Sequence, residues 1–299
     1  MIVDEVVIYL KAGRGGEPSN SSLRLSSRRI IGGGGDGGKG GDIILKASRH
    51  LYDLNKFLIN KNFKAQDGKP GGSNNKKGKN AEDLILNVPI GTIIRDIEGN
   101  FIFDLKEDNQ EFIAAKGGSG GIGNFKKTYT IEPQDGEEKK IILDYRIPND
   151  LAIVGLPNVG KTSLFNKLTN KSYKVADYPF TTKFCVWANM RIDFYDFVIL
   201  DTPPIKLNSE NKFLKHLLRS KIILFLSSEH LNYKNDFLAI KKEILKFDPE
   251  LLKNKKVFYL LTKADKISKI EDKNIILVSV EDNKGIDYLK EKVFKFLSR

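Results

Sequence analysis

A loop near the middle of the chain combines glycines, a lysine and a threonine at the spacing that binds phosphate. The pattern G-x-x-x-x-G-K-T consists of Gly155, Leu156, Pro157, Asn158, Val159, Gly160, Lys161 and Thr162. In such a loop, backbone N–H groups turn toward phosphate oxygens at a helix N-terminus. Lys161 would reach the β- and γ-phosphates, and the Thr162 hydroxyl would ligate Mg²⁺. An ordinary glycine turn would need neither side chain, so the sequence predicts a nucleoside phosphate site.

Two later segments carry residues suited to the same metal and phosphate. Residues 177–182 follow the expected helix and offer a hydroxyl or a carbonyl to Mg²⁺ and the γ-phosphate, although alone they would be a common loop. The hydrophobic run 194–200 ends in Asp201, where the second carboxylate on the Mg²⁺ side belongs. The next three residues are Thr202, Pro203 and Pro204. We expect the Asp201 carboxylate to serve the same Mg²⁺ as Thr162.

Two more strand ends carry a pattern that selects guanine. The first consists of Thr262, Lys263, Ala264 and Asp265, and the second of Ser279, Val280 and Glu281. The Asp265 carboxylate can accept hydrogen bonds from the N1–H and the exocyclic amine of guanine, and Lys263 can lay its alkyl stem along the base. Backbone N–H groups of the second set can meet the guanine carbonyl. In isolation, residues 262–265 read as a polar turn, but their place in this ordered set favours guanine.

The elements that must position these residues alternate between strand and helix. Continuous apolar runs, as buried parallel strands have, occupy 151–154, 194–200, 221–226, 256–261 and 275–279. Apolar side chains also recur at helical spacing at Ile286, Leu289, Val293 and Phe296. Strands alternating with helices predict a doubly wound α/β domain that binds its ligand at the carboxyl ends of its strands.

The first half of the chain has a different composition. Of the 26 glycines, 22 lie between Gly13 and Gly123, in clusters separated by short alternating segments that predict strands. Flexible linkers are one explanation for such clusters. Packed extended segments, in which only glycine allows close backbone approach, are the other. The pattern changes near residue 148, so we expect an all-β glycine-rich domain over 1–149, without an enzyme site, and the α/β domain over 150–299.

Charge and composition restrict the partners and the location. The net charge is +12, of which residues 1–150 contribute +2 and residues 151–299 contribute +10. Such a basic surface favours a polyanion such as RNA, although a general drift toward lysine explains it as well. Cys185 is the only cysteine, no stretch approaches the length of a membrane span, and the N-terminus is not that of a signal peptide. We expect a cytoplasmic monomer with no membrane or DNA partner.

The ordered set of motifs resembles the Obg family of ribosome-associated GTPases over nearly the whole chain. In the first half the resemblance is carried by residues 32–42, 87–92 and 115–124, and in the second half by residues 155–162, 175–182 and 213–217. It implies a glycine-rich Obg-type domain followed by a P-loop GTPase (G) domain. It also implies a role in maturation of the large ribosomal subunit, whose rRNA and proteins would be the partners.

The resemblance extends to individual site residues. It implies that Thr162 and Thr182 ligate Mg²⁺ and that Asp201 to Pro204 form the second-switch signature. The first switch would consist of Phe180, Thr181, Thr182, Lys183 and Phe184. GTP or GDP would be the ligand. For hydrolysis of GTP, Lys161 and Thr182 would be the catalytic residues.

The chain also departs from the family pattern. The family signature D-x-P-G ends in glycine, whose N–H contacts the γ-phosphate, but Pro204 stands at that position and has no N–H. Eight residues without glycine, 205–212, replace the glycine-rich segment that follows, and Thr262 replaces the usual asparagine. No C-terminal extension is expected after the G domain. Two interpretations stay open: a slow Mg²⁺-dependent GTPase, or a non-hydrolysing guanine-nucleotide-binding scaffold.

Overall fold

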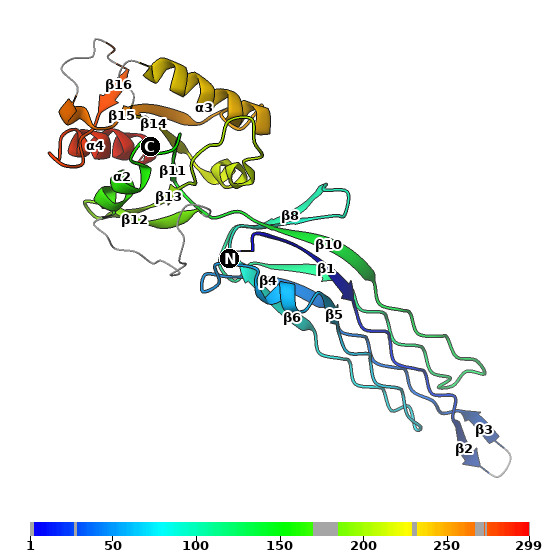
Figure 1. Ribbon diagram of the computed structural model, residues 1–299. Helices are drawn as coiled ribbons and strands as arrows, with labels where there is room; N and C mark the ends of the chain where they lie inside the picture. Colours follow the sequence, from blue (N-terminus) through cyan, green and yellow to red (C-terminus); the bar gives the residue numbers. More distant parts are fainter. Residues whose placement is uncertain are drawn as a thin grey trace. The chain divides into compact units, whose positions relative to one another are not determined.

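The structure is a computed structural model that describes residues 3–26, 29–169, 185–228, 232–266, 272 and 274–298. The chain forms two compact units, one of residues 2–145 and one of residues 146–299 (Figure 1). Residues 146–149, which precede the expected boundary at 149/150, are thus grouped with the second unit. Each unit has its own sheets and its own core.

The regular secondary structure of the first unit consists almost entirely of strands. A five-stranded sheet has the order β5 (Asn62–Lys64), β1 (Glu5–Lys11), β10 (Glu138–Tyr145), β7 (Thr92–Arg95) and β8 (Phe101–Leu105). A three-stranded sheet has the order β6 (Leu84–Pro89), β4 (Ile43–Ser48) and β9 (Glu111–Ala115), and β2 (Ser22–Ser26) pairs with β3 (Arg29–Gly32). The one-turn helix α1 (Lys56–Ile59) is its only helix among the described residues. In β1, alternate residues Val6, Ile8 and Leu10 are buried, as the alternating sequence predicts.

Beyond these sheets, the glycine clusters form extended segments that lie side by side (Figure 1). Backbone hydrogen bonds join them: the Gly16 N–H donates to the Gly38 carbonyl at 2.8 Å, and the Gly37 N–H donates to the Gly121 carbonyl at 2.8 Å. A Cβ on Gly37 would lie 1.9 Å from the Gly16 carbonyl oxygen. No other residue type permits this approach, so the clusters are packed structure and not flexible linkers.

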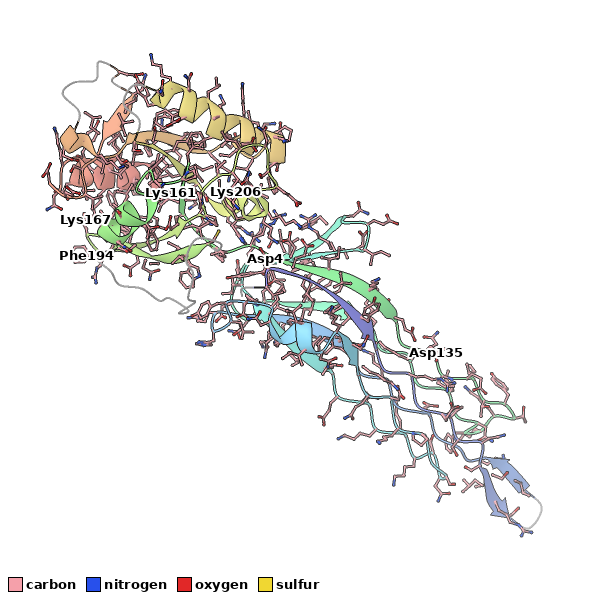
Figure 2. The ribbon with its side chains drawn as sticks, viewed as in Figure 1. Asp4, Asp135, Lys161, Lys167, Phe194 and Lys206 are labelled. Atoms are coloured by element: carbon pink, nitrogen blue, oxygen red, sulfur yellow. The ribbon has the colours of Figure 1, made fainter. Side chains whose placement is uncertain are left out.

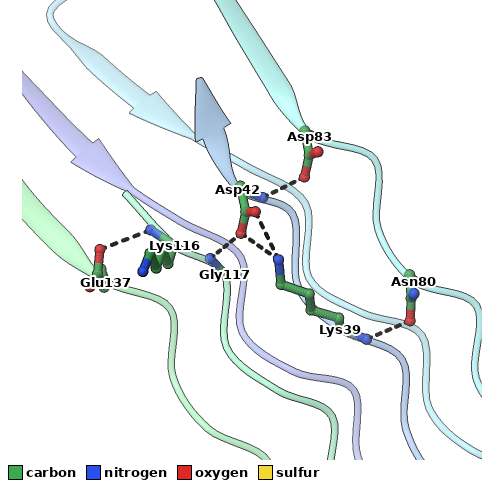
Figure 3. A network of polar contacts seen from close by, with 7 residues as sticks. All are labelled: Lys39, Asp42, Asn80, Asp83, Lys116, Gly117 and Glu137. Carbon is green, nitrogen blue, oxygen red and sulfur yellow. Dashed lines mark hydrogen bonds and ion pairs between the residues drawn. The ribbon is translucent and has the colours of Figure 1, made fainter. Parts of the chain in front are cut away.

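At some positions between neighbouring segments, the backbone N–H donates to a carboxylate or amide side chain instead of a backbone carbonyl (Figure 3). The Asp42 carboxylate accepts from the Gly117 N–H at 2.7 Å and from the Lys39 ammonium at 2.8 Å, and the Asp42 N–H donates to Asp83 at 2.8 Å. Burial alone would raise the pKa of Asp42, but the Lys39 and Gly117 hydrogen bonds outweigh it and hold that pKa below its ordinary value. The ionised carboxylate therefore joins its own segment to Gly117, and the backbone N–H of the same residue joins it to Asp83.

The second unit is an α/β domain around a six-stranded sheet. The order is β12 (Val186–Ile192), β13 (Tyr195–Asp201), β11 (Leu151–Gly155), β14 (Ile222–Ser227), β15 (Lys256–Leu261) and β16 (Ile275–Leu277). The described helices are α2 (Lys161–Leu168), η1 (Lys212–Arg219), α3 (Tyr233–Phe247), η2 (Ala264–Lys266) and α4 (Ile286–Leu297). Only the edge strand β12 is antiparallel to its neighbour, so five strands end at the same edge of the sheet.

Helices cover both faces of this sheet. Alternate residues of β14, including Leu224 and Leu226, join one buried cluster with Phe165 of α2 and Leu289 of α4. On the other face, the Tyr259 ring of β15 packs against both Phe225 of β14 and Phe237 of α3. This is the doubly wound architecture that the apolar runs predict, and it places the strand ends at one edge where the candidate residues lie.

The structure also bears on alternatives to a nucleotide site. No helix in the described ranges is long and apolar enough to cross a membrane. Among the described residues there is no group of three or more histidine, cysteine, aspartate or glutamate side chains that could hold a metal ion. The side chain of Cys185 is buried.

Candidate functional site

The phosphate loop joins the buried strand β11 to helix α2. All five residues of β11 are buried, which fixes the start of the loop at Gly155. A Cβ on Gly155 would lie 2.8 Å from the Leu226 carbonyl oxygen, so glycine is required there. Gly160 precedes the helix with φ +84°, and Asn158 has φ +60°, both in the left-handed region that ordinary side chains avoid. The sequence spacing thus places the N-terminus of α2 at the loop.

Lys161 is the first residue of α2 and its side chain is buried (Figure 2). Its ammonium donates to the carbonyl oxygens of Gly155 at 3.2 Å and Leu156 at 3.0 Å. Burial lowers the pKa of Lys161, and the nearby Asp201 carboxylate partly opposes this effect. The cation is therefore held inside the loop, on the side where phosphate oxygens would lie.

Thr162 and Asp201 meet at the carboxyl end of β13. The Thr162 hydroxyl donates to Asp201 Oδ2 at 2.8 Å. Burial raises the pKa of Asp201 from its ordinary value to about 6, against the opposing effects of the Thr162 hydrogen bond and of Lys161. The structure therefore brings together three residues that lie up to 40 positions apart in the sequence, as the motif order predicts.

These oxygen donors fit a Mg²⁺ ion. Asp201 Oδ1 is buried and has no hydrogen-bond partner among the described residues. A buried carboxylate oxygen without a partner is costly, and a cation compensates that cost. Together with the Thr162 hydroxyl, it provides the hard oxygen ligands that Mg²⁺ prefers.

The turn 262–265 lies against the phosphate loop. The Thr262 hydroxyl donates to the Val159 carbonyl at 2.7 Å, and it also lies 3.3 Å from the Ser227 carbonyl. Thr262 thus fastens the turn to the loop with one hydroxyl at the position where the family has asparagine. Lys263 has φ +58° and an exposed side chain, while Ala264 is buried. The turn 262–265 and the phosphate loop 155–162 therefore lie next to each other at the same edge of the sheet.

Asp265 is oriented by the next strand end. The buried Ser279 hydroxyl donates to Asp265 Oδ1 at 3.2 Å, and the Asp265 side chain is otherwise exposed. The Ser279 N–H donates to the Lys284 carbonyl at 3.0 Å, so a backbone donor to the guanine carbonyl would come from Val280 or Glu281. Residues 262–265 and 279–281 are side by side, as the sequence predicts.

The first-switch residues Phe180, Thr181, Thr182, Lys183 and Phe184 lie outside the described residues. The assignment of Thr182 as a metal ligand and catalytic residue therefore stays a prediction.

The segment after Asp201 is fixed to the phosphate loop. The Thr202 hydroxyl donates to the Ile153 carbonyl at 2.8 Å. Pro204 has no N–H, and the next N–H, that of Ile205, donates to the Gly155 carbonyl at 3.0 Å. The first backbone donor after the two prolines is thus used within the protein.

Sequence reasoning missed two residues that hold this segment. Asn211 and Glu243 are buried, and both hydrogen-bond to residues between 205 and 211. A signal existed for Glu243, because it lies on the same face of α3 as the buried residues Ile240 and Ile244. A glutamate on an apolar helix face requires a polar partner.

Comparison with known proteins gives the same order of domains. Residues 3–144 match the family described as GTP1/OBG, and residues 150–263 match the family described as 50S ribosome-binding GTPase. Among solved structures, the G domain of the FeoB iron transporter from T. maritima is 25% identical, covering 50% of this chain and 99% of that chain with a TM-score of 0.40. Era from Aquifex aeolicus is 24% identical, covering 49% of this chain and 56% of that chain with a TM-score of 0.38.

Curated relatives match over almost the full chain. GTPase Obg of Sulfurihydrogenibium sp. is 38% identical over 92% of this chain and 85% of its own length. GTPase Obg of Ehrlichia canis is 40% identical over 90% of this chain and 84% of its own length, and that of Thermodesulfovibrio yellowstonii is 36% identical over 98% of both chains. The chain belongs to the Obg family of GTPases, with a glycine-rich Obg-type unit followed by a P-loop G domain.

Proposed function

We propose that this Obg-type GTPase binds GTP and GDP with Mg²⁺ at residues 155–162, hydrolyses GTP slowly, and docks on the large ribosomal subunit during its assembly in the cytoplasm. The observation that carries the nucleotide part is the meeting of Lys161, Thr162 and the buried Asp201 at the phosphate loop. The turn that holds Asp265 is fastened to the same loop through Thr262. Residues 1–149 would serve docking and residues 150–299 would serve the nucleotide.

The residues of the loop would act by position and charge. Lys161 and the N–H groups at the start of α2 would bind the β- and γ-phosphates and stabilise charge on the transferred phosphoryl group. Thr162 and Asp201, with Thr182, would hold Mg²⁺, which when bound neutralises negative charge between these phosphates. No glutamine occurs between Asp201 and Ser220 to orient the attacking water, so we expect slow intrinsic turnover.

Replacement of Lys161 by alanine tests the nucleotide site. Lys161→Ala removes a charge-assisted contact of about 1.5–3 kcal/mol, so GDP and GTP affinities should fall about tenfold to a hundredfold in calorimetric titrations. The matched control is Lys167→Ala, which removes a lysine from the other end of the same helix (Figure 2). Unchanged affinity in the folded Lys161→Ala protein would remove the loop from the proposal.

The extended glycine-rich segments of the first unit are called the glycine array here. The docking surface that we propose is the end of this array at hairpin β2–β3. Two further segments reach the hairpin's root: the Asn75 N–H donates to the Gly33 carbonyl at 2.8 Å, and the Lys126 N–H donates to the Gly32 carbonyl at 2.9 Å. This tip exposes Arg24, Arg29, Lys76, Lys77, Lys126 and Lys127. Residues 18–35, 70–78 and 120–131 contain no acidic residue. A basic surface without carboxylates suits the phosphates of rRNA.

Charge reversal at the tip tests docking. The double variant Arg24→Glu and Arg29→Glu should abolish co-sedimentation with large ribosomal subunits at moderate salt while GDP affinity stays unchanged. The control is the same charge change in the G domain, Lys292→Glu with Lys295→Glu, on the exposed side of α4. Loss of co-sedimentation in the control and not in the tip variant would assign docking to the basic G domain.

A non-hydrolysing scaffold is the second candidate function. It is favoured by one observation: the Ile205 N–H, the first after Pro204, donates a hydrogen bond to the Gly155 carbonyl. A scaffold of this kind would bind GDP and GTP and dock on the subunit, but it would not turn GTP over even in the presence of that subunit. Single-turnover hydrolysis with and without large subunits separates the two functions.

A further inference from the structure

The segment between Pro204 and η1 is closed on itself by one buried amide. The Asn211 side chain accepts from the Lys206 N–H at 3.1 Å and donates to the Lys206 carbonyl at 2.9 Å and the Ser209 carbonyl at 3.1 Å. Ile205, at the start of the loop, is 1% exposed. Residues 205–211 therefore form a compact loop with a polar centre and a buried start.

Glu243 fastens this loop to α3. One carboxylate oxygen accepts from the Asn208 N–H at 3.0 Å, and the other lies 3.5 Å from the Asn211 side-chain nitrogen. Asn208 itself has φ +56°, a left-handed conformation that asparagine tolerates better than most residues. Glu243 is 8% exposed, so water competes little for these hydrogen bonds. The loop is thus held by α3 on one side and by the Gly155 carbonyl on the other.

The far end of the following helix is held as well. The Lys255 ammonium donates to the carbonyl oxygens of Leu218 at 3.0 Å and Ser220 at 2.6 Å. The Ser220 hydroxyl donates to the Asn149 side chain, whose own amide donates to the His216 carbonyl at 3.1 Å. The segment 146–149, which leads into β11, is therefore attached to η1.

We propose that residues 205–220 form a fixed strap, which keeps one conformation whether GDP or GTP is bound and leaves docking independent of the nucleotide. This inference rests on the proposed function, since it concerns the second switch of the same site. Asn211 and Glu243 are positioning residues that hold the strap.

The physical reason lies in what a γ-phosphate could contact. A ligand shifts a conformational equilibrium only through contacts that differ between the two conformations. Directly before the strap, the two positions after Thr202 carry prolines, and the first N–H of the strap, that of Ile205, already has a partner within the protein. The γ-phosphate of GTP therefore finds no free backbone N–H at the start of the strap, and GTP gains no contact there over GDP. The hydrogen bonds to Glu243 and Asn211 involve no nucleotide contact, so the proposal keeps them in both forms.

Hydrogen exchange on the full chain, followed by mass spectrometry, tests the strap. Peptides covering 205–220 should exchange at the same rate with GDP and with a non-hydrolysable GTP analogue, while both nucleotides should protect the phosphate-loop peptide. Co-sedimentation with large subunits should be equal in the two states. Slower exchange of the strap with the analogue, or nucleotide-dependent co-sedimentation, overturns the inference. Failure of both nucleotides to protect the phosphate loop would instead contradict the proposed function.

Variants of Glu243 and Asn211 test, without any nucleotide, whether these two residues hold the strap. Glu243→Ala should speed exchange of 205–211 about tenfold or more, because it removes two hydrogen bonds to a carboxylate. Glu243→Gln keeps one acceptor and should restore most of the protection, and Lys242→Ala, an exposed change on the same helix, should have no effect. If Glu243→Ala unfolds the unit, Asn211→Asp gives the same test, because it removes both donors and places a second carboxylate beside Glu243. Unchanged hydrogen exchange of residues 205–211 in a folded Glu243→Ala or Asn211→Asp protein would refute the proposed strap.

Discussion

We predict that the choice of base depends on Asp265. Its carboxylate is oriented by the Ser279 hydroxyl and has room to accept two hydrogen bonds from guanine. Asp265→Asn replaces one acceptor by a donor, so the variant should lose affinity for GDP and gain affinity for xanthosine diphosphate. Competition titrations with the three diphosphates of guanosine, xanthosine and adenosine measure this. Wild-type protein that bound ADP as tightly as GDP would refute the assignment.

Asp201 makes the stability of the nucleotide-free protein depend on pH. Burial raises its folded pKa to about 6, above its ordinary value of 3.8, so the folded state binds more protons than the unfolded state between these values. The contribution of Asp201 to the free energy of unfolding should therefore fall as pH rises from about 4 to about 6 and stay level above that, while carboxylates with a lowered pKa, such as Asp42, contribute in the opposite direction. The difference between the two pKa values corresponds to at most about 3 kcal/mol.

Replacement of Asp201 by asparagine measures this cost. Asp201→Asn should remove the part of the pH dependence that Asp201 contributes and raise the unfolding free energy at pH 7.5 by about 1–3 kcal/mol, while weakening Mg²⁺-dependent nucleotide binding. Urea unfolding from pH 4.5 to 8 provides the comparison. Asp196→Asn, an exposed change on the same strand, is the control and should leave both properties unaltered. A destabilised Asp201→Asn protein at pH 7.5 would contradict the account.

At the scale of elements, the segment after β13 determines how well GTP is distinguished from GDP. A complete second switch holds the γ-phosphate by an N–H at the position of Pro204, a contact worth about 1.5–3 kcal/mol. Without it, we expect less than about tenfold preference for a GTP analogue over GDP. Pro204→Gly should recover little, because the Ile205 N–H stays on Gly155 and the strap stays in place. Titrations that showed a larger preference, in either protein, would restore an ordinary switch.

The glycine array is the element most sensitive to single methyl groups. A Cβ at position 37 would lie 1.9 Å from a backbone oxygen, so Gly37→Ala must displace a neighbouring segment and should cost at least about 3 kcal/mol. At Gly72 the nearest atom to a Cβ is 3.4 Å away, on the Lys76 side chain, so Gly72→Ala should stay within about 0.5 kcal/mol of wild type. Denaturant unfolding followed by circular dichroism compares them. Equal stability of the two variants would mean that the array is not close-packed.

Sequence patterns predicted the local part of this architecture. The strand, loop and helix around Lys161, the carboxylate at the end of β13 and the helix α4 follow from spacing and periodicity, because each depends on neighbouring residues. Residues that join distant segments were not predictable in this way. Asp42 accepts from Gly117, 75 residues away, and Glu243 accepts from Asn208, 35 residues away. Such partners meet only when the tertiary structure brings distant segments together, and sequence periodicity does not reveal which segments meet.

At the scale of the whole molecule, our proposal divides two tasks between the two units. The glycine-rich unit carries an acid-free basic tip, and the G domain carries the phosphate and guanine residues. The charge difference between the halves indicated a polyanionic partner for the second half, but it did not reveal the tip of the first. In that unit, acidic residues elsewhere cancel the local excess of positive charge. Net charge therefore understates a local surface that could dock on RNA.

Single-turnover hydrolysis of labelled GTP, with and without large ribosomal subunits, tests the central claim most directly. The account predicts slow hydrolysis by the protein alone, because Pro204 removes a γ-phosphate contact and no glutamine lies between Asp201 and Ser220. It predicts faster hydrolysis with large subunits and none by Lys161→Ala in either condition. Rapid hydrolysis without subunits would contradict the fixed second switch, and absence of hydrolysis with subunits present would leave the protein a non-hydrolysing scaffold.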